Sequence, residues 1–273
     1  MSNLEATIRL NANVANPGQF FACCGLLELA YRVYGQAEGW FSDEQFHIAC
    51  AGDAKTLLAI LIMDPPDEVT KVANGINVKP LIAPLQFSFD GGVTNHMVLD
   101  GWMTIKVQKN TVMAAPNPPW NFWSGQQTSF RIWRDLRAAL VVQLRNIASD
   151  DYQNLFAHRV PLSGRFGFDP DAAWNALDLG FSPNDQKMEV ASSPAIEMLS
   201  AIGIQRFRVA TEDKNQSFVY ATWGEPLAPS VAAAAASDII TVPPTKRFRG
   251  RVVSRGSYAA LGQSTLINEK SYE

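Results

Sequence analysis

The stretch NPGQFFACCGLLELAYRVYG, residues 16–35, decides how the rest of the chain must be arranged. Asn16 is a good helix-capping residue, Pro17 suits the first helical position and Gly35 suits the residue after the last turn. Between these ends only Gln19, Glu28 and Arg32 are clearly hydrophilic. A helix that is apolar around most of its circumference is covered by other elements. The pattern therefore predicts a central core helix with no chemical role.

Outward from this helix, the chain alternates between short strands and helices. Residues 6–14 and 46–50 have strand patterns on either side of it, and 85–90, 97–99 and 103–108 look like antiparallel hairpins. Further helices are predicted from Asp53, over 130–147 after a cap at Ser129, from Ser193 to Gly203, and near 230–236. A hairpin is expected from 205–210 and 217–223, and a last strand over 245–254. The predicted fold class is α+β, with a mixed or antiparallel sheet and packed helices.

Length and composition set the broad class of protein. The chain has 273 residues, of which 47% are hydrophobic and 18% are charged, so a folded protein with a large core is expected. It forms either a single domain over 1–273 or two tightly packed subdomains with a boundary near the loop 114–129. The sequence contains no run of 18 apolar residues, no secretory signal and only three cysteines. These features predict a soluble cytoplasmic protein that does not contact a membrane.

The distribution of charge is more informative than the net charge of −3. Residues 111–165 carry six basic and three acidic side chains, and residues 241–273 carry six and two. The remaining segments are acidic. A local positive field can bind phosphate groups even in a protein that is anionic overall.

The second basic block contains the segment TKRFRGRVVSRGSY, residues 245–258. On a strand, alternate side chains share a face, so Arg247, Arg249 and Arg251 would point one way and Phe248 the other. The planar guanidinium group suits phosphate because it donates two parallel hydrogen bonds. The alternative is an edge strand that uses charge to prevent aggregation. Nucleic-acid binding is the favoured interpretation, with these candidate residues: Lys246, Arg247, Arg249, Arg251 and Arg255.

The first basic block combines a loop rich in aromatic residues with a helix rich in arginine. Loop aromatics beside arginines can stack on bases and hold phosphates. Buried aromatic anchors explain the same loop equally well. Three arginines of the following helix fall within roughly 60° of one another at 100° per residue. The candidates are Trp120 and Trp123 in the loop, Arg131, Arg134 and Arg145 on the helix, and Arg165 in a glycine-flanked turn, where it would meet a phosphate or Asp169.

Catalytic, metal and cofactor sites are not predicted. The sequence lacks nucleophile-elbow, P-loop, HExxH and dinucleotide-binding motifs. The histidines, His47, His96 and His158, are far apart in sequence and are best explained as structural. Adjacent Cys23 and Cys24 would diverge by about 100° on a helix and cannot share one ion. The acidic residues from Asp169 to Asp185 lack calcium-loop spacing and are expected on a solvated surface.

Several longer segments resemble one protein family. They are NPGQFFACCGLLELA with AEGWF, WSGQQTS at 123–129, RFGFDPDAAWNALDLGFSPND at 165–185 and EMLSAIGIQRF at 197–207. Together they make the chain similar to the smaller protein of the Csb series from subtype I-U (I-G) CRISPR–Cas loci. The resemblance covers most of the chain but includes no catalytic motif.

This resemblance implies a subunit of an RNA-guided surveillance (Cascade) complex that contacts guide RNA, target DNA or both, together with other Cascade subunits. It would be a backbone protein with a RAMP-like or RNA-recognition-motif-like core and helical insertions, or a counterpart of the large subunit that reads the PAM. In such complexes base pairing supplies sequence specificity, while protein holds the nucleic-acid backbone. A non-catalytic nucleic-acid-binding subunit is the main expectation. A guide-processing endoribonuclease that uses His96 or His158, and a protein–protein adaptor, are the alternatives.

Overall fold

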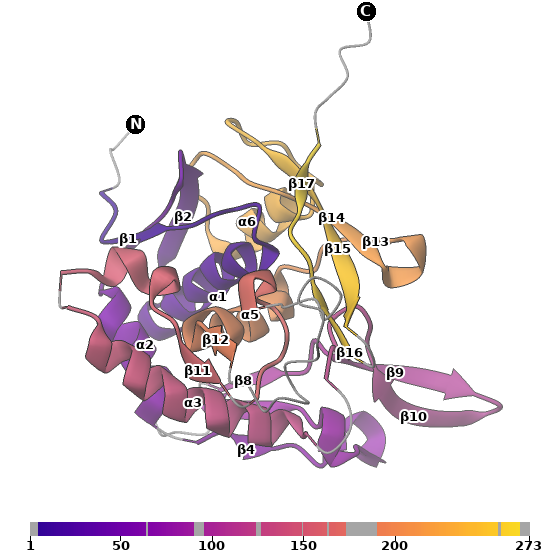
Figure 1. The fold of residues 1–273 in the computed structure, drawn as a ribbon. Coiled ribbons are helices and arrows are strands. Elements are labelled where there is room, and N and C mark those ends of the chain that lie inside the picture. Colours follow the sequence, from indigo (N-terminus) through magenta and orange to yellow (C-terminus); the bar gives the residue numbers. More distant parts are fainter. Residues whose placement is uncertain are drawn as a thin grey trace, which may run out of the picture.

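The predicted core helix lies near the centre of the computed structural model (Figure 1). The structure describes residues 5–63, 65–89, 96–123, 127–148, 150–162, 164–172, 190–255 and 258–267. Helix α1 spans Pro17–Tyr34, and the Asn16 side chain accepts a hydrogen bond of 3.0 Å from the Gln19 N–H. Gly35 has a left-handed conformation, with φ of 75°. Both predicted ends of the helix are therefore confirmed.

A second buried helix, α5 (Pro194–Arg206), packs against α1. The backbones approach so closely that a Cβ on Gly25 would lie 1.9 Å from the Leu199 carbonyl oxygen. A Cβ on Gly203 would lie 2.1 Å from the Phe21 carbonyl oxygen. The prediction that Gly203 ends this helix is wrong, because α5 continues to Arg206 and the glycine provides room for α1.

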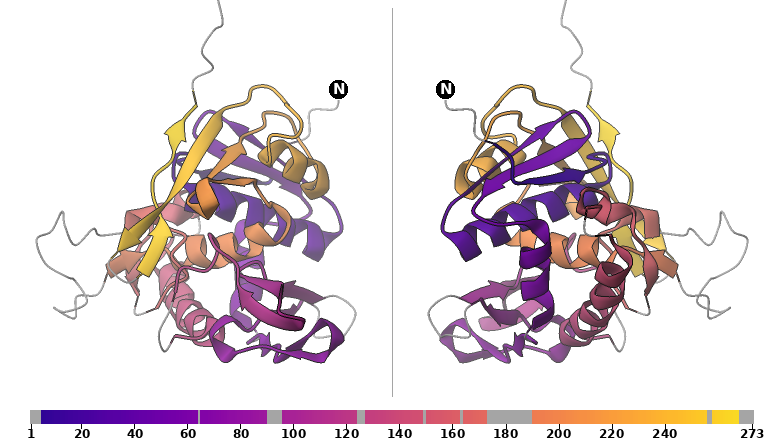
Figure 2. Two further views of the ribbon diagram at one scale, coloured as in Figure 1. Left: turned by 90° about the vertical axis from the view of Figure 1, so that its right-hand side faces the viewer. Right: turned by 90° about the vertical axis from the view of Figure 1, so that its left-hand side faces the viewer.

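A three-stranded antiparallel sheet lies above α1 in both views of Figure 2. Its order is β1-β3-β2, with β1 at Ile8–Asn11, β2 at Ala37–Ser42 and β3 at Gln45–Cys50. Burial alternates along each strand, so one face packs on the core and the other is open. An RNA-recognition motif has four strands. Here the 3-10 turn η3 (Tyr152–Ala157) lies beside β1, and Asn11 Nδ2 of β1 donates a hydrogen bond of 2.7 Å to Asn154 Oδ1 of η3. In the described residues, this sheet therefore lacks the fourth strand of the expected RNA-recognition-motif-like core.

The C-terminal part of the chain forms a second antiparallel sheet, in the order β13-β14-β15-β16, with β17 also paired to β15. The expected hairpin with 217–223 is present, but its first strand lies at 211–212 and not at 205–210, because α5 extends to Arg206. The strands are β13 at Thr211–Glu212, β14 at Ser217–Ala221, β15 at Arg247–Arg255, β16 at Tyr258–Leu261 and β17 at Thr265–Leu266.

Smaller elements complete a mixed α+β fold, as predicted. One hydrophobic cluster extends from β1 to β16 and includes the predicted boundary loop, so the core is continuous across it. The other strands are β4 at Asp67–Glu68, β5 at Lys71–Val72, β6 at Ile76–Asn77, β7 at Leu85–Ser88, β8 at His96–Leu99, β9 at Met103–Gln108, β10 at Thr111–Pro116, β11 at Val160–Leu162 and β12 at Val190–Ser192. The other helices are α2 at Ala54–Met63, α3 at Ser129–Asn146 and α6 at Pro229–Ala236, and the short 3-10 turns are η1 at Ala73–Gly75, η2 at Pro80–Ile82, η4 at Pro170–Ala172 and η5 at Asp213–Asn215.

Candidate nucleic-acid interface

Strand β15 presents its arginines as the residue pattern predicts. Phe248 is buried, with 4% of its surface exposed, whereas Arg249 and Arg251 are exposed and Arg247 is partly exposed. In the antiparallel register with β14, Arg247 lies opposite Ala221 and Arg249 opposite Val219. Alternation on a strand places the three arginines on one face. The predicted arginine row is confirmed.

Two members of this row have carboxylate partners within the chain. Arg247 forms an ion pair with Asp238, and Arg249 Nε lies 3.3 Å from Glu212 Oε2. The side chains of Arg249 and Glu212 are 45% and 43% exposed. Exposed ion pairs of this kind typically contribute less than about 1 kcal/mol, so a phosphate can compete with the carboxylate for the arginine.

The predicted arginines of α3 are also on the surface. Side chains of Arg131 and Arg134 are 60% and 63% exposed, and both lie near Asp135, at 4.0 and 3.2 Å. Arg145 is exposed in the last turn. The cap of α3 is Thr128, one residue before the predicted Ser129. Arg137, which was not predicted as a site residue, instead donates to the Ile62 carbonyl at the end of α2.

The tryptophans of the preceding loop are not available for base stacking, which corrects that prediction. Trp120 is 7% exposed and packs edge-on against Phe21 of α1, with ring centroids 5.3 Å apart. Trp123 is 4% exposed, and its indole N–H donates to the Leu81 carbonyl at 2.8 Å. Both residues are core anchors, because two large rings gain more from burial than from exposure on a loop.

The two basic blocks lie apart in Figure 1, with α3 along the lower edge and β15 on the upper right. The segment 164–168 lies between them. A Cβ on Gly164 would lie 3.7 Å from Asp135 Oδ2 of α3, and the Gly167 carbonyl accepts a hydrogen bond from the Leu261 N–H of β16 at 3.1 Å. Arg165 of this segment is partly exposed, and its positive charge favours the ionised form of the buried Glu197 side chain. The side chain of Arg255 lies outside the described residues.

Lys246 lines a different feature, a groove of about 980 Å³ next to the N-terminal end of α1. Its other ionic side chains are Arg159, Asp43, Glu44 and Asp171. Acidic groups outnumber basic ones, so the groove is not the cationic channel that the two basic blocks would form together. The predicted arginines of α3 and of the β15 row do not line this groove.

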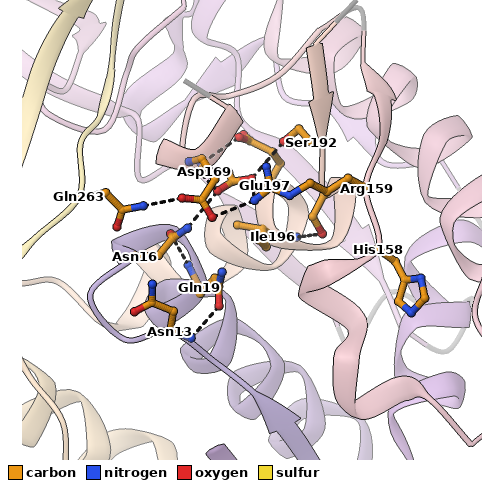
Figure 3. A network of polar contacts seen from close by, with 12 residues as sticks. Asn13, Asn16, Gln19, His158, Arg159, Asp169, Ser192, Ile196, Glu197 and Gln263 are labelled. Carbon is orange, nitrogen blue, oxygen red and sulfur yellow. Dashed lines mark hydrogen bonds and ion pairs between the residues drawn. The ribbon is translucent and has the colours of Figure 1, made fainter. Parts of the chain in front are cut away.

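A buried polar network lies behind this groove and joins the beginnings of α1 and α5 (Figure 3). Asp169 is 2% exposed and accepts a hydrogen bond from Asn16 Nδ2 at 3.1 Å. Arg159 lies 3.7 Å from Asp169 and 2.8 Å from Asp171. The expectation that Asp169 belongs to a solvated acidic surface is wrong. Its carboxylate is stabilised by a guanidinium group and by the positive ends of two helix dipoles.

Glu197 is the second buried carboxylate of the network. Its side-chain oxygens accept hydrogen bonds from the backbone N–H groups of Gly167, Phe168 and Asp169 at 2.9, 3.3 and 3.0 Å. Burial raises the pKa of Glu197 above its ordinary value. Glu197 therefore holds the segment that carries Arg165 against α5. No local sequence signal distinguishes it from an exposed glutamate, because its partners lie about 30 positions away.

The three histidines have different environments. His158 Nε2 lies 2.9 Å from Asp151 Oδ2, and the side chains are 28% and 34% exposed. Hydrogen bonds from Asn154 and His158 lower the pKa of Asp151. The ring of His47 stacks on Trp40, with centroids 5.3 Å apart, and burial lowers its pKa. His96 begins β8 and is exposed.

Trp40, His47 and Arg9 form one row across the open face of the β1-β3-β2 sheet, which sequence reasoning missed. A ring pair beside an arginine resembles a base-stacking surface. The surrounding charges oppose that use, because Glu38 shares this face with Trp40, and the turn between β2 and β3 carries Asp43 and Glu44. The row is therefore a poor surface for a polyanion.

Within the described ranges, no three His, Cys, Asp or Glu side chains are grouped so that they would hold a metal ion. In the same part of the chain, none of the helices has the length and apolar character needed to span a bilayer. Comparisons with protein-family models, curated proteins and solved structures gave no match.

Proposed function

We propose that this protein is a non-catalytic, nucleic-acid-binding subunit of a type I CRISPR RNA-guided surveillance complex, related to the Csb series of subtype I-U (I-G) loci. It would hold the backbone of guide RNA or target DNA, near the PAM if DNA is contacted. The segments quoted above carry the resemblance to the family.

One structural observation carries the nucleic-acid part of the proposal. Arg247, Arg249 and Arg251 share one accessible face of β15, at every second residue. Alternate strand residues are about 7 Å apart, which is similar to the spacing of phosphates along a single strand. The exposed arginines of α3 lie beyond Arg165, so the two blocks would contact separate parts of a long strand.

The test is salt-dependent binding of fluorescein-labelled single-stranded RNA and duplex DNA, measured by fluorescence anisotropy. We expect log Kobs to fall linearly with log salt concentration, with a slope of about −0.7 for every phosphate that the protein neutralises on a single strand. The triple substitution R247A/R249A/R251A should weaken binding and flatten this slope. The control K55A/K71A/K79A removes the same charge from exposed positions outside the β15 sheet and α3. Affinity that is unchanged in the first variant, or equally reduced in both, would remove the proposed interface.

The His158–Asp151 pair gives the endoribonuclease alternative a specific basis. A carboxylate that holds an imidazole in one orientation prepares it for proton transfer. If this alternative is correct, the protein cleaves CRISPR repeat RNA and H158A abolishes cleavage, whereas H96A serves as the matched control. Absence of cleavage, or cleavage that neither substitution affects, would end this interpretation.

A further inference from the structure

The hairpin β9–β10 projects from the body of the molecule at the lower right of Figure 1. Its strands pair with each other and with no further strand of the described chain. Lys109 and Asn110 form the two-residue turn, with φ of 44° and 65°. Positive φ at both turn residues matches the twist of a tight β-hairpin. The element is therefore a regular arm and not an irregular loop.

One face of this arm is aliphatic and open to solvent. Every residue from Ile105 to Met113 is exposed, and Val107, Val112 and Ile105 have exposed fractions of 71%, 48% and 41%. The register places Val107 opposite Val112, and Ile105 opposite Ala114, on the same face. A two-stranded hairpin is only marginally stable in water by itself, and a contiguous exposed apolar face marks an interaction surface.

The charge of the arm restricts the partner. No Asp or Glu occurs from Gly101 to Arg134, and Lys106 and Lys109 are exposed on the arm. A complementary surface would therefore carry carboxylates or phosphates around an apolar centre. The aliphatic face has no side-chain hydrogen-bond donor and no aromatic ring, whereas base edges require donors and exposed bases prefer ring stacking. These properties favour a protein surface over nucleic acid.

We propose that the arm, residues 103–116, docks through its aliphatic face onto an apolar patch bordered by Asp and Glu on another protein subunit. This interaction presupposes the function proposed above, because it places the partner within the same RNA-guided complex. The arm would then attach the subunit to its assembly, while β15 and α3 contact nucleic acid.

The experiment compares incorporation of variants into the complex reconstituted from the full chain, the other protein subunits of its locus and guide RNA. V107T/V112T makes the aliphatic face polar, yet it keeps the side-chain shape and the β-branched geometry that strands favour. Affinity for the other subunits should fall about tenfold or more. The control I239T/I240T alters another exposed aliphatic pair, with exposed fractions of 76% and 38%, and should have no effect.

Hydrogen exchange of the wild-type protein identifies the occupant directly. Amides of residues 105–113 should become protected when the other subunits bind, and K106E/K109E should weaken that binding most at low salt. Protection on adding RNA or DNA to the isolated chain would identify nucleic acid as the occupant, and concentration-dependent protection of the isolated chain would identify a second copy. Either result overturns the proposal, as does a wild-type chain that does not join these subunits.

The two proposals fail in different ways. If the wild-type protein binds no nucleic acid, and the arm still docks in wild type and in R247A/R249A/R251A, the proposed nucleic-acid function fails and the protein is an adaptor. If the protein binds RNA but the amides of the arm stay unprotected from hydrogen exchange in the presence of the other subunits, only the docking proposal is rejected.

Discussion

Glu197 depends strongly on its hydrogen bonds, because its side chain is fully buried and accepts them from three successive backbone N–H groups. We expect E197Q to lower the free energy of unfolding by about 1–3 kcal/mol, since the NH2 group that replaces one carboxylate oxygen cannot accept the backbone hydrogen bonds made to that oxygen. Urea denaturation followed by tryptophan fluorescence measures the change. E225Q removes the same charge from an exposed position and should stay within about 0.5 kcal/mol of wild type. Equal effects of the two variants would show that the network adds no stability.

The pH dependence of this effect has a definite sign. Burial raises the pKa of Glu197 above its ordinary value of 4.5, so the folded protein retains a proton that the unfolded chain has released. The resulting stabilisation is fully present below the unfolded pKa and is lost as the pH rises through the folded pKa. The unfolding free energy of wild type minus that of E197Q should therefore fall as the pH increases above 4.5. Denaturation curves at several pH values test this, and a difference that rises with pH would contradict it.

Glu28 illustrates how far a residue's role depends on distant partners. It is one of the three clearly hydrophilic residues in the sequence of α1, but it is 1% exposed and pairs with Arg32 and Arg206. Arg32 is one helical turn away and could be anticipated. Arg206 lies 178 positions further along the chain and could not.

At the scale of elements, the contact between α1 and α5 brings two helix backbones together without room for a Cβ between them. A Cβ on either Gly25 or Gly203 would overlap a backbone carbonyl of the other helix, and a backbone cannot move aside as a flexible side chain can. We expect G25A and G203A each to destabilise the protein by about 3 kcal/mol or more, because the helices must separate. Thermal or urea unfolding measures the loss.

G35A is the matched control for these variants. No atom lies within 4 Å of a Cβ at Gly35, but its φ of 75° is unfavourable for alanine. Its cost should therefore be only the conformational penalty of about 1–2 kcal/mol. If all three substitutions have the same effect, close packing is not the reason for glycine at 25 and 203.

At the scale of the whole molecule, the chain carries a net charge of −3, so the proposed binding of phosphates would depend on local positive fields. In the proposed complex, the carboxylates of Asp238 and Glu212 beside the β15 row would compete with an incoming phosphate. We expect D238N/E212Q to strengthen binding of single-stranded RNA by about threefold to tenfold at low salt, because Arg247 and Arg249 lose their internal partners. Fluorescence anisotropy measures the affinity.

The double substitution D67N/E225Q changes the net charge equally at exposed positions outside the row. It should raise affinity much less. If both variants bind alike, the row has no special part in binding single-stranded RNA.

Local patterns in the sequence were sufficient for the elements whose signals lie within a few residues. The cap, proline and glycine at the ends of α1 and the arginine alternation on β15 depend only on neighbouring residues, and both predictions were confirmed. The family resemblance and the nucleic-acid function rest on the sequence as well, and they stay predictions.

The tertiary structure alone decided which side chains face solvent and which have partners. Trp120 and Trp123 are core anchors, Asp169 and Glu197 are buried, and Gly203 lies inside a helix and not at its end. Each of these outcomes depends on contacts between residues that are far apart in the sequence, and periodicity within one segment does not encode such contacts. The open aliphatic face of the β9–β10 arm is of the same kind, because alternation predicts the two faces of a hairpin but not whether the rest of the chain covers one of them.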